Sequence, residues 1–315
     1  MQEDQSKKHP NDFNNEINLH EIFYVLLEGR RIIISVTAFA SIIGVIYSLL
    51  LPNIYESKAL LVPVNASGNI SGALQGYGSV ARLAGINLPS GGDEGNSAKA
   101  IKKISSLSFF ENNIMTNIFL PDLMAIKSWN YKTNTLAFDE NIYKKNNNTW
   151  VRDYSYPKLQ VPSAQESFEV FTRKHLSLSE DKITGFITLS MKHQSPFIAM
   201  EWAELVINEV NAFYRQKDKS ESEKSVSYLN KQISLTNLSE IKQVIAQLLQ
   251  EETKKLTLVE ANKFYVFEYI DPPAIMEKKS GPKRALICIL SALLGGMLGI
   301  VLVFIKHYPL KGKVA

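Results

Sequence analysis

The chain has 315 residues, 21% of them charged, with a formal net charge of +4 at pH 7. Between its two longest uncharged stretches, residues 52–284 carry 28 lysines and arginines against 25 acidic residues, a balance that argues against binding of nucleic acid or an anionic polymer through bulk charge. Cys288 is the single cysteine and lies in the second stretch, so residues 52–284 have neither a disulfide nor a thiolate metal site.

The two uncharged stretches are residues 32–51 and 285–305. At ~1.5 Å per residue each reaches ~30 Å, the hydrocarbon thickness of a bilayer, so both are predicted to be transmembrane helices. A cleaved signal peptide is disfavoured for the first, because its apolar run is too long and no small-residue cleavage pattern follows it. The tails, 1–31 and 306–315, are then expected on one side, but the flanking lysines and arginines are balanced and do not say which side.

Small residues recur along both spans at every fourth position, and charges are absent from both. Such stripes let helix backbones approach closely in lipid, although transmembrane helices are rich in small residues in any case. The candidate packing residues are Ala40, Gly44, Ser48, Ser291, Gly295, Gly296 and Gly299.

The first part of the intervening segment is predicted to hold a strand at 55–64, from alternating apolar residues. Residues 65–95 contain eight of the sixteen glycines. This segment is interpreted as a mobile loop, or else as a contact loop, because residues 82–86 form an apolar island within it. It contains no phosphate-binding glycine motif.

Further along, a helix in two pieces is expected over 97–119, ended by Pro121, and an irregular or weakly stranded region over 129–159. Ser163 is predicted to cap a short helix that runs to residue 174. A β-hairpin is expected from strands at 176–180 and 186–193.

The longest predicted feature is a helical hairpin. Residues 197–235 contain no proline or glycine, and their apolar helical spacing gives way to a wholly polar run at 215–225. Arms of ~30 Å are expected at 215–235 and 238–259, with Thr236 and Asn237 in the turn and Asn237 as the N-cap of the second arm. A strand at 264–270 follows.

The predicted fold is therefore α+β. Two terminal transmembrane helices flank an α/β base, formed by 52–214 and 260–271, from which the long helical hairpin 215–259 protrudes. A proline-rich junction, 272–284, leads into the second span.

Recognisable catalytic chemistry is missing from the sequence. No zinc-protease, nucleophile-elbow or phosphate-loop motif occurs. Paired acids at 93–94, 139–140 and 180–181 are interpreted as solvated turn residues, and His175 and His193 as strand-end residues rather than ligands. We expect no enzyme activity and no catalytic, cofactor-binding or metal-binding residues; a glycan-cleaving enzyme remains the alternative of a different class.

The junction resembles that of the Wzz, or chain length determinant, family of polysaccharide co-polymerases without a fused kinase. The resemblance is carried by the sequence around Pro272, Pro273, Pro282, Lys283 and Arg284, directly before a glycine-rich span. Ile17-Asn18-Leu19 before the first span, Pro52 and Tyr55 after it, and residues 83–86 are similar too.

The resemblance implies a bacterial inner-membrane protein with a periplasmic ectodomain and both termini in the cytoplasm. It further implies a homo-oligomeric ring that sets the chain length of O-antigen lipopolysaccharide beside a Wzy-type polymerase on undecaprenyl-linked glycan. The alternative pathway is polymerisation or export of capsule or exopolysaccharide with a separate kinase partner. Kinase activity in this polypeptide is not expected, and a two-span sensor is disfavoured.

Overall fold

The computed structural model describes residues 19–64, 96–262 and 264–307. The chain divides into two compact units, one formed by residues 1–52 and 281–315 and the other by residues 53–280. The glycine-rich segment 65–95, its apolar island at 82–86 and the acidic pair 93–94 lie outside the described residues.

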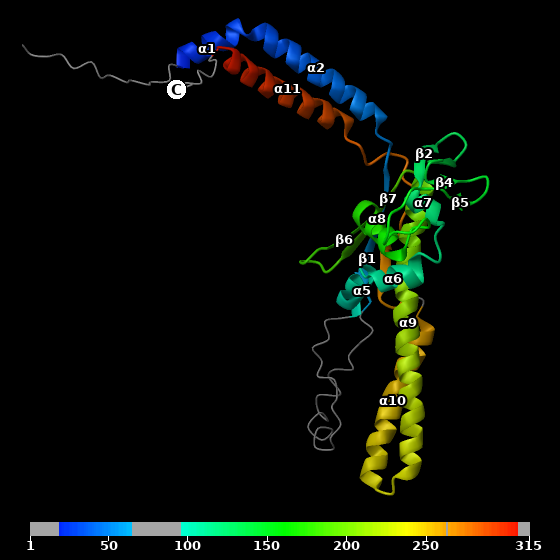
Figure 1. The fold of residues 1–315 in the computed structure, drawn as a ribbon. Coiled ribbons are helices and arrows are strands. Elements are labelled where there is room, and N and C mark those ends of the chain that lie inside the picture. Colours follow the sequence, from blue (N-terminus) through cyan, green and yellow to red (C-terminus); the bar gives the residue numbers. More distant parts are fainter. Residues whose placement is uncertain (1–18, 65–95, 263, 308–315) are drawn as a thin grey trace, which may run out of the picture. The chain divides into compact units, whose positions relative to one another are not determined.

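The first unit consists of three described helices, α1 (Leu19–Glu28), α2 (Arg30–Leu50) and α11 (Arg284–His307) (Figure 1). Both α2 and α11 are long and apolar enough to cross a membrane, with mean hydropathies of 2.3 and 2.7. Each begins one or two residues before the apolar run, at an arginine. Helix α1 was not foreseen in the tail; Val25 on it is buried.

The second unit is built on a four-stranded antiparallel sheet with strand order β6-β7-β1-β8. Its strands are β1 (Tyr55–Pro63), β6 (Leu176–Glu180), β7 (Ile187–His193) and β8 (Phe267–Asp271). Ala59 pairs with Leu189 and Leu61 with Ile187, and all four side chains are buried. Because the side chains of a strand alternate between faces, this register puts one apolar face into the core. The predicted strand at 55–64 and the predicted β-hairpin are confirmed.

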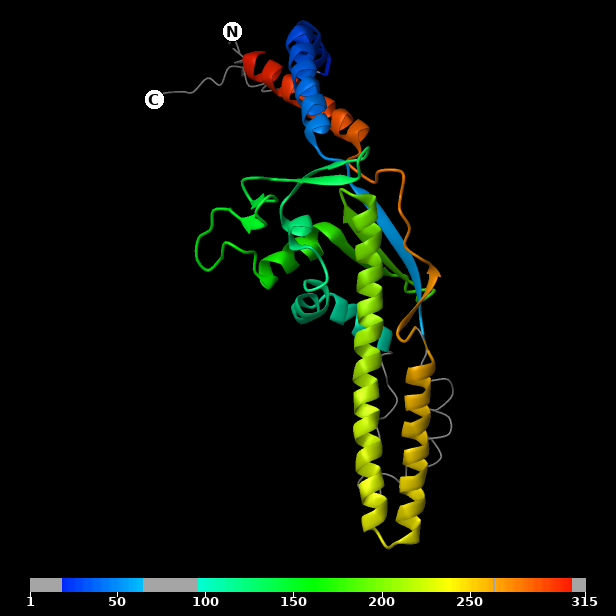
Figure 2. The same ribbon diagram turned by 90° about the vertical axis from the view of Figure 1, so that its right-hand side faces the viewer.

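Helix α9 (Pro196–Leu235) packs on β1 and β7 and then continues beyond the sheet (Figure 2). It begins with proline in its first turn, where a missing N–H costs nothing. Its first half buries a regular face against the sheet: Ala199, Trp202, Ala203, Val206, Ile207, Val210, Asn211 and Tyr214. After Tyr214 only Ser222 is buried, so the same helix serves both base and hairpin.

Helix α10 (Ser239–Ala261) returns alongside the outer half of α9 (Figures 1 and 2). The predicted long hairpin is therefore confirmed. The predicted cap is wrong, because the N-cap residue is Leu238 and no side chain caps the helix. Asn237 lies one residue too early, and Glu240 consequently falls at the second helical position instead of the third, where a capping box needs it.

Short helices complete the core beside the sheet: α5 (Asn96–Ile104), α6 (Leu107–Phe109), the π-helical turn η1 (Phe110–Ile114), α7 (Leu120–Met124), α8 (Ala164–Val170) and the π-helical turn η2 (Phe171–His175). Phe110 and Phe171 pack with ring centroids 5.0 Å apart, and Phe171 packs on Trp202. Ser163 caps α8 as predicted, accepting from the Glu166 N–H. Pro121 was expected to end a helix but lies in the first turn of α7, where its fixed φ favours helix initiation.

The region expected to be weakly stranded forms two small hairpins. One pairs β2 (Ile126–Asn130) with β3 (Thr135–Phe138), and the other pairs β4 (Tyr143–Lys144) with β5 (Thr149–Trp150).

One buried side chain fastens the returning chain to α9. The Oδ1 atom of Asn211 accepts hydrogen bonds from the backbone N–H groups of Tyr265, Val266 and Phe267 at 3.2, 2.7 and 3.0 Å. Its Nδ2 donates to the Phe267 carbonyl at 3.0 Å. Two of these N–H groups precede β8, which explains why the strand begins at Phe267 and not at the predicted residue 264.

Replacing Asn211 by leucine is expected to destabilise the second unit. Three buried N–H groups would lose their acceptor, at about 1–3 kcal/mol each, so we expect a loss of at least about 3 kcal/mol. The measurement is urea unfolding of the full chain in detergent, followed by tryptophan fluorescence. Asn208→Leu is the matched control, because Asn208 is exposed on the same helix. Equal midpoints for the two variants would contradict the role of Asn211.

Candidate functional site

The α2–α11 pair is held at close range by three of the small residues predicted to pack. A Cβ atom added at Gly44 would lie 2.0 Å from Ser291 Oγ, one at Gly295 would lie 2.5 Å from Ala40 Cβ, and one at Gly299 would lie 2.9 Å from Ile33 Cα. Real Cβ atoms do not approach other atoms so closely. Glycine at these positions is therefore what lets the two helix backbones meet.

The remaining predicted packing residues differ in their surroundings. Ser48 is buried, whereas Gly296 lies at the edge of the contact, since a Cβ there would be 3.7 Å from Thr37 Oγ1. Gly29 was missed. It joins α1 to α2, and a Cβ on it would lie 2.4 Å from a methyl carbon of Val303. Its spacing from Gly44 does not continue the four-residue stripe, so the stripe did not indicate it.

The proline-rich junction divides between the two units. In the second unit Pro273 is buried and Pro272 exposed, and the chain then runs beside the start of β1. Ser57 Oγ donates to the Ala274 carbonyl at 2.8 Å, and the Ser280 N–H donates to the Ile54 carbonyl at 2.8 Å. The entrance and the exit of the second unit are thus tied together.

The other junction residues belong to the first unit. The Arg284 N–H donates to the Pro282 carbonyl at 2.9 Å, and the Ile287 N–H donates to the Lys283 carbonyl at 3.2 Å. These bonds form the first turn of α11, which begins at Arg284. The junction therefore ends directly in an apolar helix.

The hairpin turn is the three-residue connection 236–238. Thr236 closes α9 through its N–H, which donates to the Gln232 carbonyl. Exposed apolar side chains surround the turn: Leu235, Leu238 and Ile241. The tip is therefore more apolar than the solvated arms that lead to it.

A hydrogen bond and an ion pair hold the root of the hairpin together. The Tyr265 hydroxyl donates to Asp218 Oδ2 at 2.5 Å, and Lys219 forms an ion pair with Glu260. Burial is the main cause, and the hydrogen bond to Asp218 the second, of a Tyr265 pKa well above its usual range. Burial likewise raises the pKa of Tyr269 on β8 to about 12. Both tyrosines are therefore neutral structural groups at ordinary pH.

Two histidines, the buried His193 and the half-buried His175, lie where β7 and η2 meet the start of α9. The rings of His175 and His193 are 5.7 Å apart, and both pack edge-on against Trp202. His193 Nε2 donates to the Asp122 carbonyl at 3.1 Å, while its Nδ1 accepts from the Ser195 N–H at 3.0 Å. This arrangement fits a neutral ring. His193 ends β7 as predicted, whereas His175 ends the helical turn η2 and not a strand. The sequence did not indicate that the two side chains meet.

Burial lowers the pKa of both histidines to about 4. Nearby, burial and then the charge of Glu201 raise the pKa of the Asp122 carboxyl to about 6, against the opposing influence of Lys145. His175 also faces Lys174 and the Lys192 carbonyl. These shifts follow from packing in the core and are not arranged around an open cleft.

Two of the acidic pairs act as turn residues, as predicted. Asp139 Oδ1 accepts from the Asn141 N–H at 3.0 Å, and Asp181 accepts from the Ile183 N–H and the Thr184 hydroxyl. In the part of the chain that the structure describes, no three His, Cys, Asp or Glu side chains gather as a metal site would require.

Comparison with known families identifies the chain's relatives. The family model described as "Chain length determinant protein" (Wzz) matches residues 15–113, and the model described as "G-rich domain on putative tyrosine kinase" (GNVR) matches residues 233–308. Together they span more than half of the chain and include both long apolar helices. The chain therefore carries a chain length determinant (Wzz) domain followed by a GNVR domain. Members of the chain length determinant family are polysaccharide co-polymerases associated with the inner membrane.

Solved structures similar to this chain include a "full-length bacterial polysaccharide co-polymerase" at 14% identity and a TM-score of 0.38, covering 93% of this chain and all of that one. A fragment of WzzB, a polysaccharide co-polymerase from Salmonella Typhimurium, matches at 14% identity and a TM-score of 0.29, covering 73% of this chain and all of the fragment. At these scores the family assignment rests on the two sequence matches. A search of curated proteins found no matching sequence.

Gly295→Leu is expected to separate α2 from α11, because its Cβ would lie 2.5 Å from Ala40 Cβ. Gly296→Leu is the matched control at the neighbouring position. Spin labels on Ile43→Cys and Leu293→Cys, in a Cys288→Ser background, report the distance between the helices in detergent micelles. We expect a longer and broader distance distribution only for Gly295→Leu. Indistinguishable distributions in the two variants would refute the close contact.

Lowering the pH is expected to reduce the unfolding free energy of the second unit, because His175 and His193 bind protons less readily in the folded chain than in the unfolded chain. Their folded pKa of about 4 lies below the ordinary 6.5, so their stabilising effect is complete above pH 6.5 and is lost as the pH falls toward 4. Asp122, whose pKa is raised, acts in the opposite direction. We expect a net loss of about 3 kcal/mol in unfolding free energy between pH 7 and pH 4.5.

The check is urea unfolding at both pH values. His175→Phe should lose less than half as much stability as the parent chain, whereas Asp122→Asn should lose more, because the opposing group is gone. A parent chain and a His175→Phe variant with the same pH dependence would rule out this origin.

Proposed function

We propose that this protein regulates the chain length of a surface polysaccharide, O-antigen lipopolysaccharide, as a homo-oligomeric scaffold in the bacterial inner membrane, acting with a Wzy-type polymerase on undecaprenyl-linked glycan. The observation that carries the proposal is the chain length determinant match over residues 15–113. Family members act as oligomeric polysaccharide co-polymerases, which supports the same role here.

In this proposal α2 and α11 cross the membrane, with residues 52–284 in the periplasm and residues 1–31 and 306–315 in the cytoplasm. The apolar character of both helices supports their place in the membrane. The base, 52–214 and 260–271, carries the hairpin 215–259, and the junction 272–284 leads back to the membrane.

The mechanism that we propose is geometric. Residues 52–284 have a nearly balanced charge, so an assembly of copies holds polymerase and growing glycan through many weak contacts rather than one tight site. The assembly thereby biases when the polymerase releases its product. No bond is made or broken by this protein.

A second candidate has an observation of its own. The match over residues 233–308 is to a domain described from tyrosine kinases, which favours a role in polymerisation or export of capsule or exopolysaccharide with a separate kinase partner. Both candidates are scaffolds and differ in pathway and partner.

The test is a deletion strain whose lipopolysaccharide, capsule and secreted polysaccharide are each resolved by size. Loss of a preferred O-antigen length, restored by the intact gene, is the expected result. Complementation with Gly295→Leu should restore the preferred length poorly, and complementation with Gly296→Leu should restore it well. A change confined to capsule or exopolysaccharide would select the second candidate, and unchanged sizes in all three polymers would reject both.

A further inference from the structure

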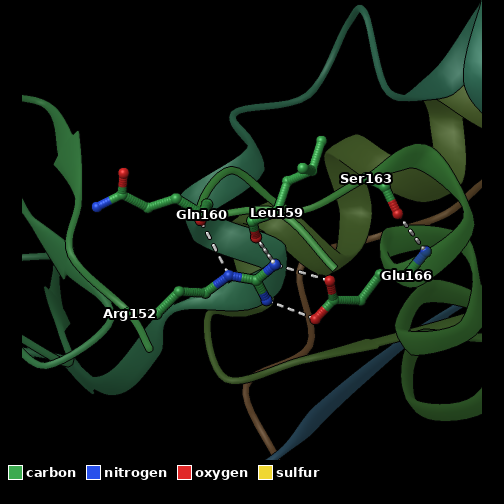
Figure 3. A network of polar contacts seen from close by, with 5 residues as sticks. All are labelled: Arg152, Leu159, Gln160, Ser163 and Glu166. Atoms are coloured by element: carbon green, nitrogen blue, oxygen red, sulfur yellow. Dashed lines mark hydrogen bonds and ion pairs between the residues drawn. The ribbon is translucent and has the colours of Figure 1, made fainter. Parts of the chain in front are cut away.

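An exposed loop in the second unit is fastened at both ends by one arginine. Arg152 Nε donates to the Gln160 carbonyl at 2.9 Å, and its Nη2 donates to the Leu159 carbonyl at 2.6 Å (Figure 3). The loop, residues 153–161, is exposed throughout. A loop whose ends are joined in this way is a compact Ω-type loop, a class that is frequently functional.

The arginine is itself held in place. Its guanidinium forms a bidentate ion pair with the Glu166 carboxylate on α8: Nη1 donates to Oε1 at 2.5 Å and Nη2 donates to Oε2 at 2.7 Å (Figure 3). The two side chains are 13% and 17% exposed, so solvent screens the pair only partly. A bidentate pair fixes the orientation of the guanidinium in addition to neutralising its charge. The bond to Arg152 lowers the pKa of Glu166, which stays ionised.

The loop displays aromatic and apolar side chains to solvent. Tyr154 is 49% and Tyr156 86% exposed, and their rings pack edge to face with centroids 6.4 Å apart. Leu159 and Val161 are exposed beside them. The Lys158 N–H donates to the Ser155 carbonyl at 3.0 Å, a turn that orders the loop internally. An ordered loop that exposes such side chains marks a binding surface.

We propose that this tyrosine loop, residues 153–161, binds the glycan chain, with the rings of Tyr154 and Tyr156 stacking on sugar rings. The inference rests on the proposed function and names a contact site for its polymer. Sugar rings offer apolar C–H faces and hydroxyl groups, and tyrosine offers both a broad apolar ring and a polar tip.

The chemistry of the loop favours a sugar over other occupants. Asp153 and Lys158 are its only charged residues and cancel, so the loop lacks the positive charge that would attract an anionic lipid headgroup. A specific protein interface needs roughly 20–30 residues on each side, far more than this nine-residue loop supplies. A few sugar units need only a small, rigid surface.

The experiment measures binding of a short oligosaccharide to the full-length protein in detergent micelles. The oligosaccharide is cleaved from the host strain's own surface polysaccharide and freed of lipid, and binding is followed by saturation-transfer difference NMR. Tyr154→Ala with Tyr156→Ala is expected to weaken binding roughly tenfold or more, since both rings that stack on the sugar are removed. Tyr156→Phe, which keeps the ring, should bind nearly as the parent chain does.

Tyr131→Ala is the matched control, because Tyr131 is also a loop tyrosine, 72% exposed, outside the tyrosine loop. It should leave binding unchanged. All these positions are exposed, so tryptophan fluorescence unfolding is expected to match that of the parent chain.

Three results would overturn the proposal: no binding by the parent chain, equal binding by the double variant, or equal loss in Tyr131→Ala. Competition by glycerol 3-phosphate would point to a lipid headgroup instead. Unchanged oligosaccharide binding together with lost co-purification of the polymerase would point to a protein partner. These outcomes are separate from the deletion phenotype, so the loop can fail while the proposed function stands.

Discussion

The second unit depends on the attachment of one helix to the segment that returns from its own hairpin. The side-chain amide oxygen of Asn211 on α9 accepts hydrogen bonds from three consecutive backbone N–H groups, just before and at the start of β8. Those groups are buried, and leaving them without acceptors would cost more than most side-chain contacts contribute. Because the same helix lies on the sheet and forms an arm of the hairpin, this attachment joins the two parts of the unit.

A hydrogen bond and an ion pair at the root of the hairpin add to this attachment, closer to the solvent. Tyr265 binds Asp218 about one helical turn beyond Tyr214, the last buried core residue of α9, and Lys219 pairs with Glu260 nearby. The ion pair is exposed and contributes little by itself. The apolar seam beyond it is sparse, since Ile245 and Val259 are the buried residues of α10. The root is therefore well fixed, and the outer hairpin has few buried contacts of its own.

Much of this fold followed from periodicity. The alternation in β1 and β7 and the absence of proline and glycine from residues 197–235 are strong signals, because each extends over many residues and agrees with the packing that forms. Single-residue assignments were less certain. Asn237 and Pro121 both belong to residue types with two common positions at helix ends, and the sequence alone did not say which position each would take. The tyrosine loop was not predicted, because the Arg152–Glu166 pair joins residues in a stretch without periodicity.

The contacts between α2 and α11 were likewise predicted in part: the sequence indicated close packing but not which glycines make it. The stripe of small residues indicated that close packing was possible, but which glycines face the partner depends on helix rotation and register, as the contrast between Gly295 and Gly296 shows. The contact between His175 and His193 and the role of Asn211 were missed for a related reason. Their roles come from contacts between distant segments, and no local pattern encodes such contacts.

The hydrogen bonds from Ser57 to Ala274 and from Ser280 to Ile54 leave the two ends of the second unit side by side. A folded module with adjacent ends can be inserted at a surface turn of an unrelated host protein without stretching either partner. It can equally be permuted, with new termini opened at an exposed turn such as 181–185 and the old ones joined by a short linker. Evolution and engineering therefore have the same freedom to change the helices of the first unit while the sheet and its hairpin stay intact.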